Sequence, residues 1–262
     1  MVTTKAVKST ALITLKGNWA TFCAQAMVPV FATIIITLSS MLFSLPFGNI
    51  AAYLIFVLLF TFIVSPLFLG TIRSYWRGAN GQIDGVSGCF YYFSSKKERK
   101  RAFKFNLILL LHWLKVALLL LLPAIIVHIA TGSEIYEFFG ISIPLFLMNL
   151  RYLDNVFYII ALVLATAHLI SLHLPSFLFV SCEDKTPREC FSRGIDIGKY
   201  TKSRFFTHLL GFSGWILLSL TLIPLLFTMP YLLMSYVVES RYNVAFYNLS
   251  GQSQNQTPIY SV

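Results

Sequence analysis

The sequence predicts an all-α, polytopic transmembrane bundle of about six spans, and composition and the length of the apolar blocks carry that prediction. Of the 262 residues, 57% are apolar and only 11% are charged, and the mean hydropathy is +0.74. A soluble domain draws about a quarter of its residues from Asp, Glu, Lys and Arg. Residues 17–72 and 205–238 contain no charged side chain, whereas about 20 apolar residues suffice for one helix to cross a bilayer core. The chain is therefore expected to lie in a lipid bilayer.

Six apolar segments are separated by polar or turn-forming sequence. Their predicted bounds as spans are 20–44, 50–72, 105–129, 156–181, 205–221 and 224–238. The first two form a hairpin, because the uncharged turn signal at 45–49 contains Pro and Gly. The last two divide residues 205–238, which contain two prolines and are too long for one untilted span; a re-entrant pair, or one kinked span in a total of five, are the alternatives. Residues 1–249 then form a single membrane domain, and the polar residues 250–262 are expected to be a disordered tail.

Two shorter amphipathic helices are predicted outside the spans. Residues 5–16 place apolar side chains four residues apart with lysines on other faces, which is typical of an interfacial helix on the inner leaflet. The apolar positions are Val7, Ala11, Leu15 and the following Trp19. Further along, Thr186 precedes Pro187 and lies three residues before Glu189, the pattern of a capping box. A cytoplasmic helix is expected from there to about Gly198.

The basic residues indicate the orientation. If the N-terminus is inside, 18 of the 20 Lys and Arg residues lie in segments that face the cytoplasm, and only Arg151 lies outside. Cytoplasmic loops of membrane proteins carry such an excess. Both termini are therefore expected in the cytoplasm, with the chain in the cell (plasma) membrane. Topology alone accounts for the net charge of +10, so no nucleic-acid partner is expected.

Several short motifs lie along the chain in a fixed order. They are Leu15-Lys16-Gly17-Asn18-Trp19, Leu122-Pro123-Ala124-Ile125-Ile126, Gly198-Lys199, Phe205-Phe206, Phe212-Ser213-Gly214-Trp215, Pro230-Tyr231 and Ala245-Phe246-Tyr247. Together with the capped helix, this order resembles the bacterial integral membrane family catalogued as domain of unknown function 975, over nearly the whole chain. Ala124 stands where that family has glycine, and the gap before the last motif is longer. The resemblance implies a multi-pass bacterial membrane protein and brings no established activity or catalytic residue.

Lys115 is the one Lys or Arg inside a predicted span. Counted from Phe105 at 1.5 Å per residue, it lies about 15 Å deep, near the bilayer centre. An ionisable group at that depth is a candidate functional residue. His112 shares its helix face, and His168 and His173 reach comparable depths if the third and fourth spans are neighbours. These four residues would then form a buried polar cluster able to relay protons or bind an anion. The alternative is that Lys115 extends toward the membrane surface and each histidine bonds a carbonyl or a serine.

A second candidate site is the basic run before the third span. Its cations are Lys96, Lys97, Arg99, Lys100, Arg101 and Lys104. Each basic residue near a membrane surface adds about 1 kcal/mol to the binding of anionic lipid. The alternative is that the run only fixes the topology.

Catalytic and metal-binding motifs are absent from the sequence. It contains no GxSxG, P-loop or HExxH pattern, and no Asp or Glu falls in a predicted span. The four cysteines have no CxxC spacing, so reduced, unligated thiols are expected. We therefore expect no enzyme, cofactor or metal. The favoured function is a non-catalytic scaffold or lipid-interacting component, whose partners are the bilayer and its anionic head groups. The alternative is a small-solute or lipid transporter with a polar path past Lys115 and the histidines.

Overall fold

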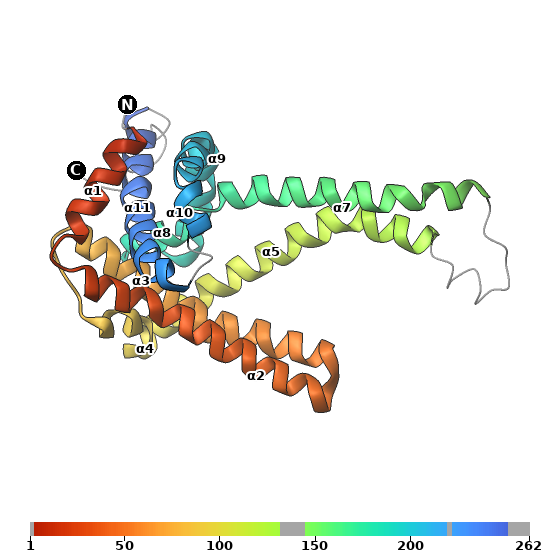
Figure 1. Ribbon diagram of the computed structural model, residues 1–262, viewed down its shortest axis with the longest axis horizontal. Helices are drawn as coiled ribbons and strands as arrows, with labels where there is room; N and C mark the ends of the chain where they lie inside the picture. Colours follow the sequence, from red (N-terminus) through yellow and green to blue (C-terminus); the bar gives the residue numbers. More distant parts are fainter. Residues whose placement is uncertain (1–2, 132–144, 219–221, 251–262) are drawn as a thin grey trace. The chain divides into compact units, whose positions relative to one another are not determined.

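A computed structural model describes residues 3–131, 145–218 and 222–250, and all regular structure within them is helical (Figure 1). The helices are α1 (Thr4–Leu15), α2 (Trp19–Leu59), α3 (Ser65–Ala79), α4 (Tyr91–Ser94), α5 (Lys96–Thr131), α7 (Leu145–Ser171), α8 (Pro175–Ser181), α9 (Pro187–Gly211), α10 (Ser213–Leu218) and α11 (Leu222–Leu249), with a π-helical segment η1 (Phe60–Val64) and a 3-10 helix η2 (Val86–Phe90). The chain divides into a first unit, Met1–Ile108 with Ser171–Val262, and a second unit, Leu109–Ile170.

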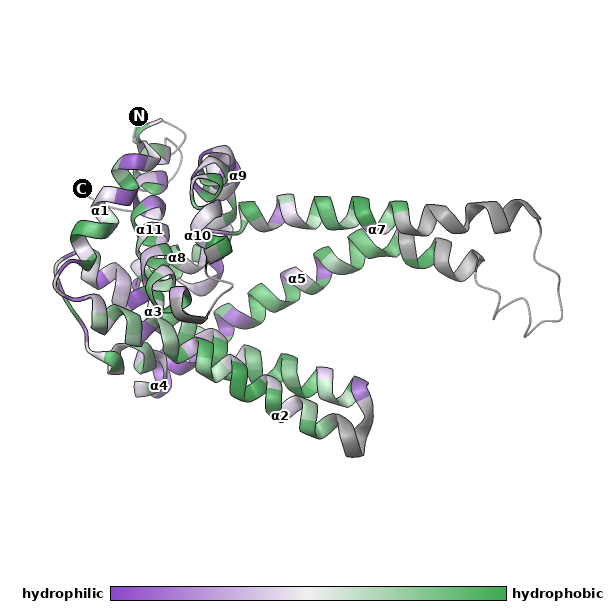
Figure 2. Ribbon diagram, in the orientation of Figure 1, coloured by the Kyte–Doolittle hydropathy of each residue, from purple (hydrophilic) through white to green (hydrophobic). Residues whose placement is uncertain are grey.

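Three helices in the described residues are long and apolar enough to cross a membrane. They are Trp19–Phe43, Gly48–Ala79 and Lys96–Pro123. In the first two, only 28% and 33% of the most apolar window is buried, and Figure 2 shows that apolar residues predominate along α2. Exposed apolar area costs about 25 cal/mol per Å² in water, and a lipid solvent removes that cost. The prediction of an all-α membrane protein is thus supported by three candidate spans, half of the predicted number.

The predicted first hairpin is present. Inside α2, Gly48 has φ 80° and ψ 167°, which ends one helix and begins the next. A residue with a Cβ is strained at this positive φ, so glycine suits the turn. Figure 1 shows the two halves of α2 running antiparallel. The returning helix continues past its predicted end at residue 72 to Ala79.

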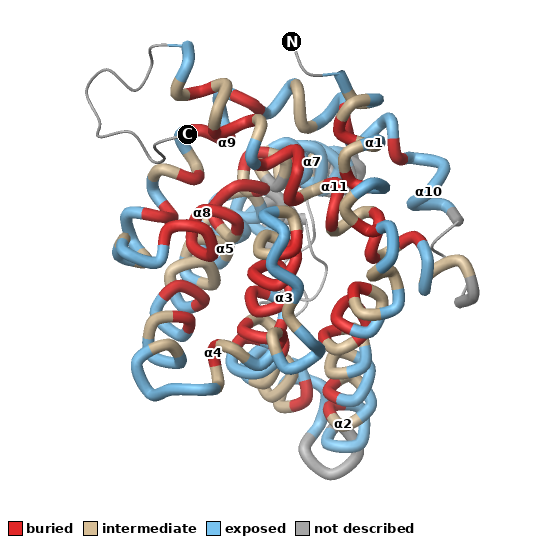
Figure 3. Tube along the Cα trace, turned by 90° about the vertical axis from the view of Figure 1, so that its left-hand side faces the viewer, coloured by how far each residue is buried: buried red, intermediate tan, exposed pale blue. Residues whose placement is uncertain are grey.

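The predicted N-terminal amphipathic helix is also present, as α1, but its apolar stripe faces protein. Val7, Ala11 and Leu15 are fully buried, and α1 packs along α11. The predicted role of this face was to enter the inner leaflet. In the structure it is instead covered by protein of the first unit. Figure 3 shows the buried positions on both helices.

The predicted capping box begins α9. The Thr186 hydroxyl accepts a hydrogen bond from the Glu189 amide at 3.3 Å, and the Glu189 carboxylate accepts one from the Thr186 amide at 3.1 Å. The helix then continues beyond its predicted end at Gly198. This glycine is used for packing, because a Cβ there would lie 2.0 Å from the Ser171 carbonyl oxygen. α9 ends only at Gly211.

The predicted span 205–221 is interrupted. Its described part, residues 205–218, is divided between the end of α9 and α10, with the break at Phe212. α11 is described from Leu222, and residue 221 of the predicted break near Thr221 to Pro224 lies outside the described residues.

The predicted span 156–181 is interrupted as well. α7 ends at Ser171, and α8 begins with Pro175 at its first turn. Proline cannot donate the backbone hydrogen bond that would continue α7. α8 then enters the core of the first unit, where the rings of Phe179 and Phe105 stack at 4.3 Å. The predicted tail lies outside the described residues from 251 onward.

Candidate functional site

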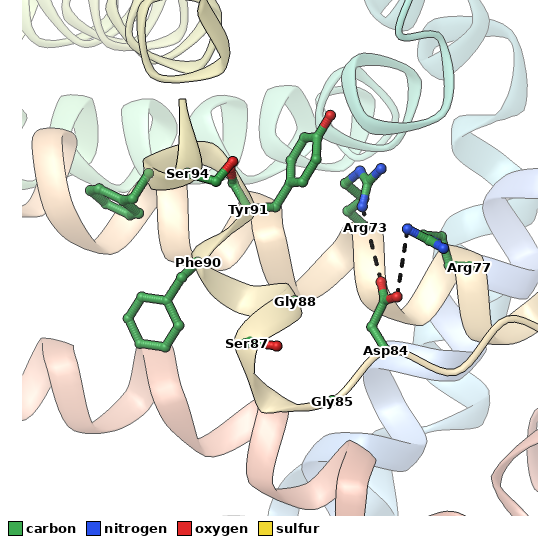
Figure 4. Close-up of a pocket in the computed structure, with 10 residues that line it drawn as sticks. Arg73, Arg77, Asp84, Gly85, Ser87, Gly88, Phe90, Tyr91 and Ser94 are labelled. Atoms are coloured by element: carbon green, nitrogen blue, oxygen red, sulfur yellow. Dashed lines mark hydrogen bonds and ion pairs between the residues drawn. The ribbon is translucent and has the colours of Figure 1, made fainter. Parts of the chain in front are cut away.

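A charged network lies where the end of α3 meets the loop that follows it. Both Nε and Nη2 of Arg73 lie 2.9 Å from Oε1 of Glu183. The Asp84 carboxylate lies between Arg73, at 4.0 Å, and Arg77, at 3.5 Å, as Figure 4 shows. Two guanidinium groups therefore face two carboxylates, and the network of Arg73, Arg77, Asp84 and Glu183 is close to neutral.

Neighbouring groups hold this network in place. The side-chain amide of Gln25 donates to the carbonyls of Asp84 at 2.7 Å and Gly85 at 3.1 Å. The Arg73 guanidinium lies 3.6 Å from the centre of the Tyr91 ring. A pocket of about 440 Å³ opens beside it, with Phe90 and Ser94 in its wall (Figure 4). The guanidinium groups already pair with carboxylates. The network is therefore better explained as a structural contact that holds the loop after α3 in place than as a ligand site.

Gly70 tests how tightly the loop packs on α3. A Cβ at Gly70 would lie 2.1 Å from the Cys89 carbonyl oxygen, a backbone atom that cannot rotate away. We expect Gly70→Ala to lower the free energy of unfolding by about 1–3 kcal/mol. Gly85→Ala is the control, since its Cβ would meet only Ser87 at 3.8 Å. Thermal unfolding in detergent measures both, and equal midpoints would contradict the tight packing.

Arg101, a predicted lipid contact, points into the protein. Its Nη2 donates to the carbonyls of Phe179 at 3.1 Å, Cys182 at 2.7 Å and Lys185 at 3.4 Å. These carbonyls include the end of α8, where a helix has no partners of its own. The guanidinium also lies 4.3 Å from the Phe179 ring centre. Arg101 is therefore a C-terminal cap of α8, and it differs in this from the other cations of the run.

The contacts of Arg101 and Arg73 join two segments that are distant in sequence. Residues 73–104 and 182–204 were both predicted to be cytoplasmic, and the Arg73–Glu183 and Arg101–Cys182 contacts bring them together. The two predicted cytoplasmic segments thus lie side by side in the first unit.

The remaining predicted lipid contacts are exposed. We call them the basic patch: Lys96, Lys97, Arg99, Lys100 and Lys104. None has an ion-pair partner within the described ranges. Most of the patch lies in the first turns of α5, at the positive end of the helix dipole, where cations are unfavourable and anions are stabilised. The patch therefore has both the charge and the location to attract an anion.

Of the predicted polar cluster, the structure brings two residues together. In the second unit, the Nε2 atoms of His112 and His168 lie 2.9 Å apart, with the rings stacked at 5.1 Å. One imidazole must donate and the other accept, so the contact requires at least one neutral ring. α5 and α7 are thus neighbours at this level, as expected for the third and fourth spans.

The other two predicted members are found elsewhere. Lys115 is exposed on α5, where its long stem can carry the ammonium group toward a membrane surface. His173 belongs to the first unit, where its ring stacks on Phe205 at 3.9 Å. In the described residues, the predicted cluster of four is therefore a contact between two histidines.

Glu239 is a buried acidic residue that was not predicted as a site residue from the sequence. In the first unit, Glu239 on α11 is 4% exposed, and its Oε2 lies 3.8 Å from Nδ1 of His208 on α9. Burial raises the pKa of the Glu239 carboxyl, and Arg204 and Asn243 partly oppose that rise. The sequence does hold a signal, because Thr228, Ser235, Glu239 and Asn243 recur on one face of α11 and are all buried.

Comparisons with known protein families, with curated proteins and with solved structures find no match for this chain. The resemblance to the family of domain 975 stays a prediction.

Proposed function

We propose that the chain is a non-catalytic, multi-pass component of a bacterial cell membrane that binds anionic lipid head groups through the basic patch. The exposure of five unpaired cations at the start of α5 carries this proposal. The arginines of the charged network and Arg101 are already bound within the protein, so the patch is what this end of α5 offers to a partner.

The energetics suit a membrane surface better than a single bound ion. At about 1 kcal/mol for each basic residue near an anionic surface, the five side chains together contribute a few kcal/mol. Salt screens exposed charges over about 8–10 Å at physiological ionic strength. The interaction should therefore be strongest with membranes rich in anionic lipid and should weaken at high salt.

The proposed topology has both termini in the cytoplasm and six apolar segments. The contact between segments 73–104 and 182–204 supports their placement on one side. For the last two segments, 205–221 and 224–238, the proposal keeps two short spans, with a re-entrant pair as the alternative; both return the C-terminus to the cytoplasm.

The basic patch is tested by lipid selectivity in proteoliposomes. We expect wild type to associate with spin-labelled phosphatidylglycerol several-fold more strongly than with phosphatidylcholine, and replacement of all five patch cations by Gln to remove most of that preference. A matched control replaces five exposed cations elsewhere: Lys5, Lys16, Arg188, Lys199 and Lys202. If the control lowers the selectivity as much as the patch variant does, only net charge matters and the proposal fails.

Topology is tested with engineered cysteines, because the native ones are unsuitable. Cys89 and Cys190 are buried, and desolvation raises the pKa of both thiols, that of Cys190 to about 12. They should react with an impermeant maleimide on neither side of the membrane. We expect Ser95→Cys and Ser192→Cys, both exposed, to react only after the membrane is permeabilised, and Asn49→Cys to react in intact cells. Labelling of the first two from outside would reverse the orientation.

The second candidate function is a small-solute or lipid transporter with a path past Lys115. The His112–His168 contact favours it, because a hydrogen-bonded imidazole pair within an apolar segment can pass a proton. Movement of fluorescent lipid between the leaflets of proteoliposomes tests the lipid version. Activity that is lost when both histidines are changed to Ala would support it, and inactive wild-type protein would exclude it.

A further inference from the structure

A groove between α1, α3 and α11 in the first unit encloses about 520 Å³. We infer that this groove binds one anionic amphiphile, with its phosphate or carboxylate against Arg241 and its apolar part along Trp76 and Tyr242. The volume lies within the range of small-molecule sites, about 300–1,000 Å³. The groove shares no residue with the basic patch, so the inference does not rest on the proposed function.

The charge of the groove specifies an anion. Among the described residues that line it, Arg241 is the one charged side chain and none is acidic. Nη1 of Arg241 donates to the Ala79 carbonyl at 3.3 Å, which fixes the position of the guanidinium group. A guanidinium has five N–H donors, so donors remain for a ligand. Their planar arrangement matches the oxygens of a phosphate or a carboxylate.

The other polar groups add direction without adding charge. The hydroxyls of Thr10 and Thr14 donate to carbonyls of α1 itself, at 2.9 Å and 3.0 Å. The exposed amide of Asn80 lies in the same lining as Arg241 and can donate a further hydrogen bond. Tyr242 and Asn248 also line the groove. One strong cation beside neutral polar groups suits a singly charged head group better than a polyanion.

The location of the groove specifies an amphiphile. Trp76 and Ala79 belong to the last turn of the candidate span that ends at Ala79, and Asn80 follows it. The end of a span lies at the depth of lipid head groups, where Trp and Tyr rings are favoured because they have an apolar body and a polar tip. Trp76 and Tyr242 are both half-buried. The wall is therefore apolar and aromatic beside a single cation, as an anionic lipid requires.

The experiment uses full-length protein in a non-ionic detergent and native mass spectrometry. The probes are phosphatidylglycerol, phosphatidylcholine and sn-glycerol 3-phosphate. We expect one tightly retained phosphatidylglycerol, with about tenfold preference over phosphatidylcholine. Arg241→Gln should remove the preference, and Ala245→Trp, which fills the groove without a change of charge, should remove retention. Arg188→Gln, an exposed arginine of α9, and the five-residue patch variant should both keep the bound lipid.

The outcomes separate the sources of the anion and the two lipid sites. If sn-glycerol 3-phosphate displaces the lipid at similar concentration, the groove recognises the phosphate itself; if it does not, the apolar part is needed. Either result supports the site. Equal retention of the two phospholipids by wild type would overturn the inference, and this test needs no variant to fold. An unchanged preference in Arg241→Gln would also overturn it. Loss of the bound lipid in the patch variant alone would assign it to the basic patch.

Discussion

Replacing Arg101 by Leu is expected to lower the free energy of unfolding by about 3–5 kcal/mol, although Arg101 lies in a run of otherwise exposed cations. The change removes hydrogen bonds from a charged donor to three backbone carbonyls, and bonds of this kind contribute about 1.5–3 kcal/mol each before losses overlap. It also removes the contact with the Phe179 ring, which adds about 0.5–2 kcal/mol. The carbonyls at the end of α8 would be left without their donor.

Lys104→Leu is the matched control, because it removes one exposed cation three residues further along the same helix. Its effect on stability should stay within about 0.5 kcal/mol. Unfolding in detergent, followed by tryptophan fluorescence, measures both variants. Lipid selectivity should show the reverse pattern. Lys104→Leu should lower the preference for anionic lipid, because Lys104 belongs to the basic patch, whereas Arg101→Leu should leave that preference unchanged. Similar stability of the two variants would show that the Arg101 cap contributes little.

Features that depend on neighbouring residues were predictable from the sequence. The turn at Gly48 and the capping box at Thr186 each need only a few consecutive residues with defined backbone chemistry. The apolar blocks of α2 and α5 likewise predict long helices without knowledge of their partners. The fold class and the first hairpin follow from these local signals.

Features that depend on packing were not predictable. Glycine is common at helix ends, so Gly198 was predicted to end the helix. In the structure, its lack of a side chain lets α9 pack closely against the Ser171 carbonyl. Residues 205–211 begin the predicted span 205–221 because they are uncharged and mostly apolar, yet in the structure they continue the amphipathic α9. Composition measures the apolar character of a segment, whereas tertiary contact decides whether lipid or protein covers it.

The candidate sites show the same division. The basic run was identified from charge alone, but nothing in its sequence distinguishes Arg101 from its neighbours; only the position of α8 does. The His112–His168 contact followed from comparing depths on two antiparallel helices. Glu239 was missed because it lies one residue beyond the predicted end of the last span, although the polar face of α11 passes through it.

Glu239 gives the second large effect that we expect. Glu239→Lys should lower the free energy of unfolding by about 3–5 kcal/mol, because it places an unpaired charge in a buried site. The surrounding cations make a further cation unfavourable: Arg204 lies on α9, and the Lys8 ammonium donates to the Gly211 carbonyl nearby. Glu239→Gln keeps the size and the hydrogen-bonding capacity of the side chain, and it should fold with near wild-type stability.

The two variants also predict how stability depends on pH. Because burial raises the pKa of Glu239 in the folded protein, the folded state binds this proton more tightly than the unfolded state does. The contribution of Glu239 to stability is therefore fully present below its unfolded pKa and is lost as the pH rises through the folded pKa. Glu239→Gln resembles the protonated form, so its stability relative to wild type should increase as the pH rises above about 4.5, the ordinary value for a glutamate. Thermal unfolding at several pH values measures the difference. Parallel curves for wild type and Glu239→Gln would show that the carboxyl titrates alike in both states, and the buried position of Glu239 would then need another explanation.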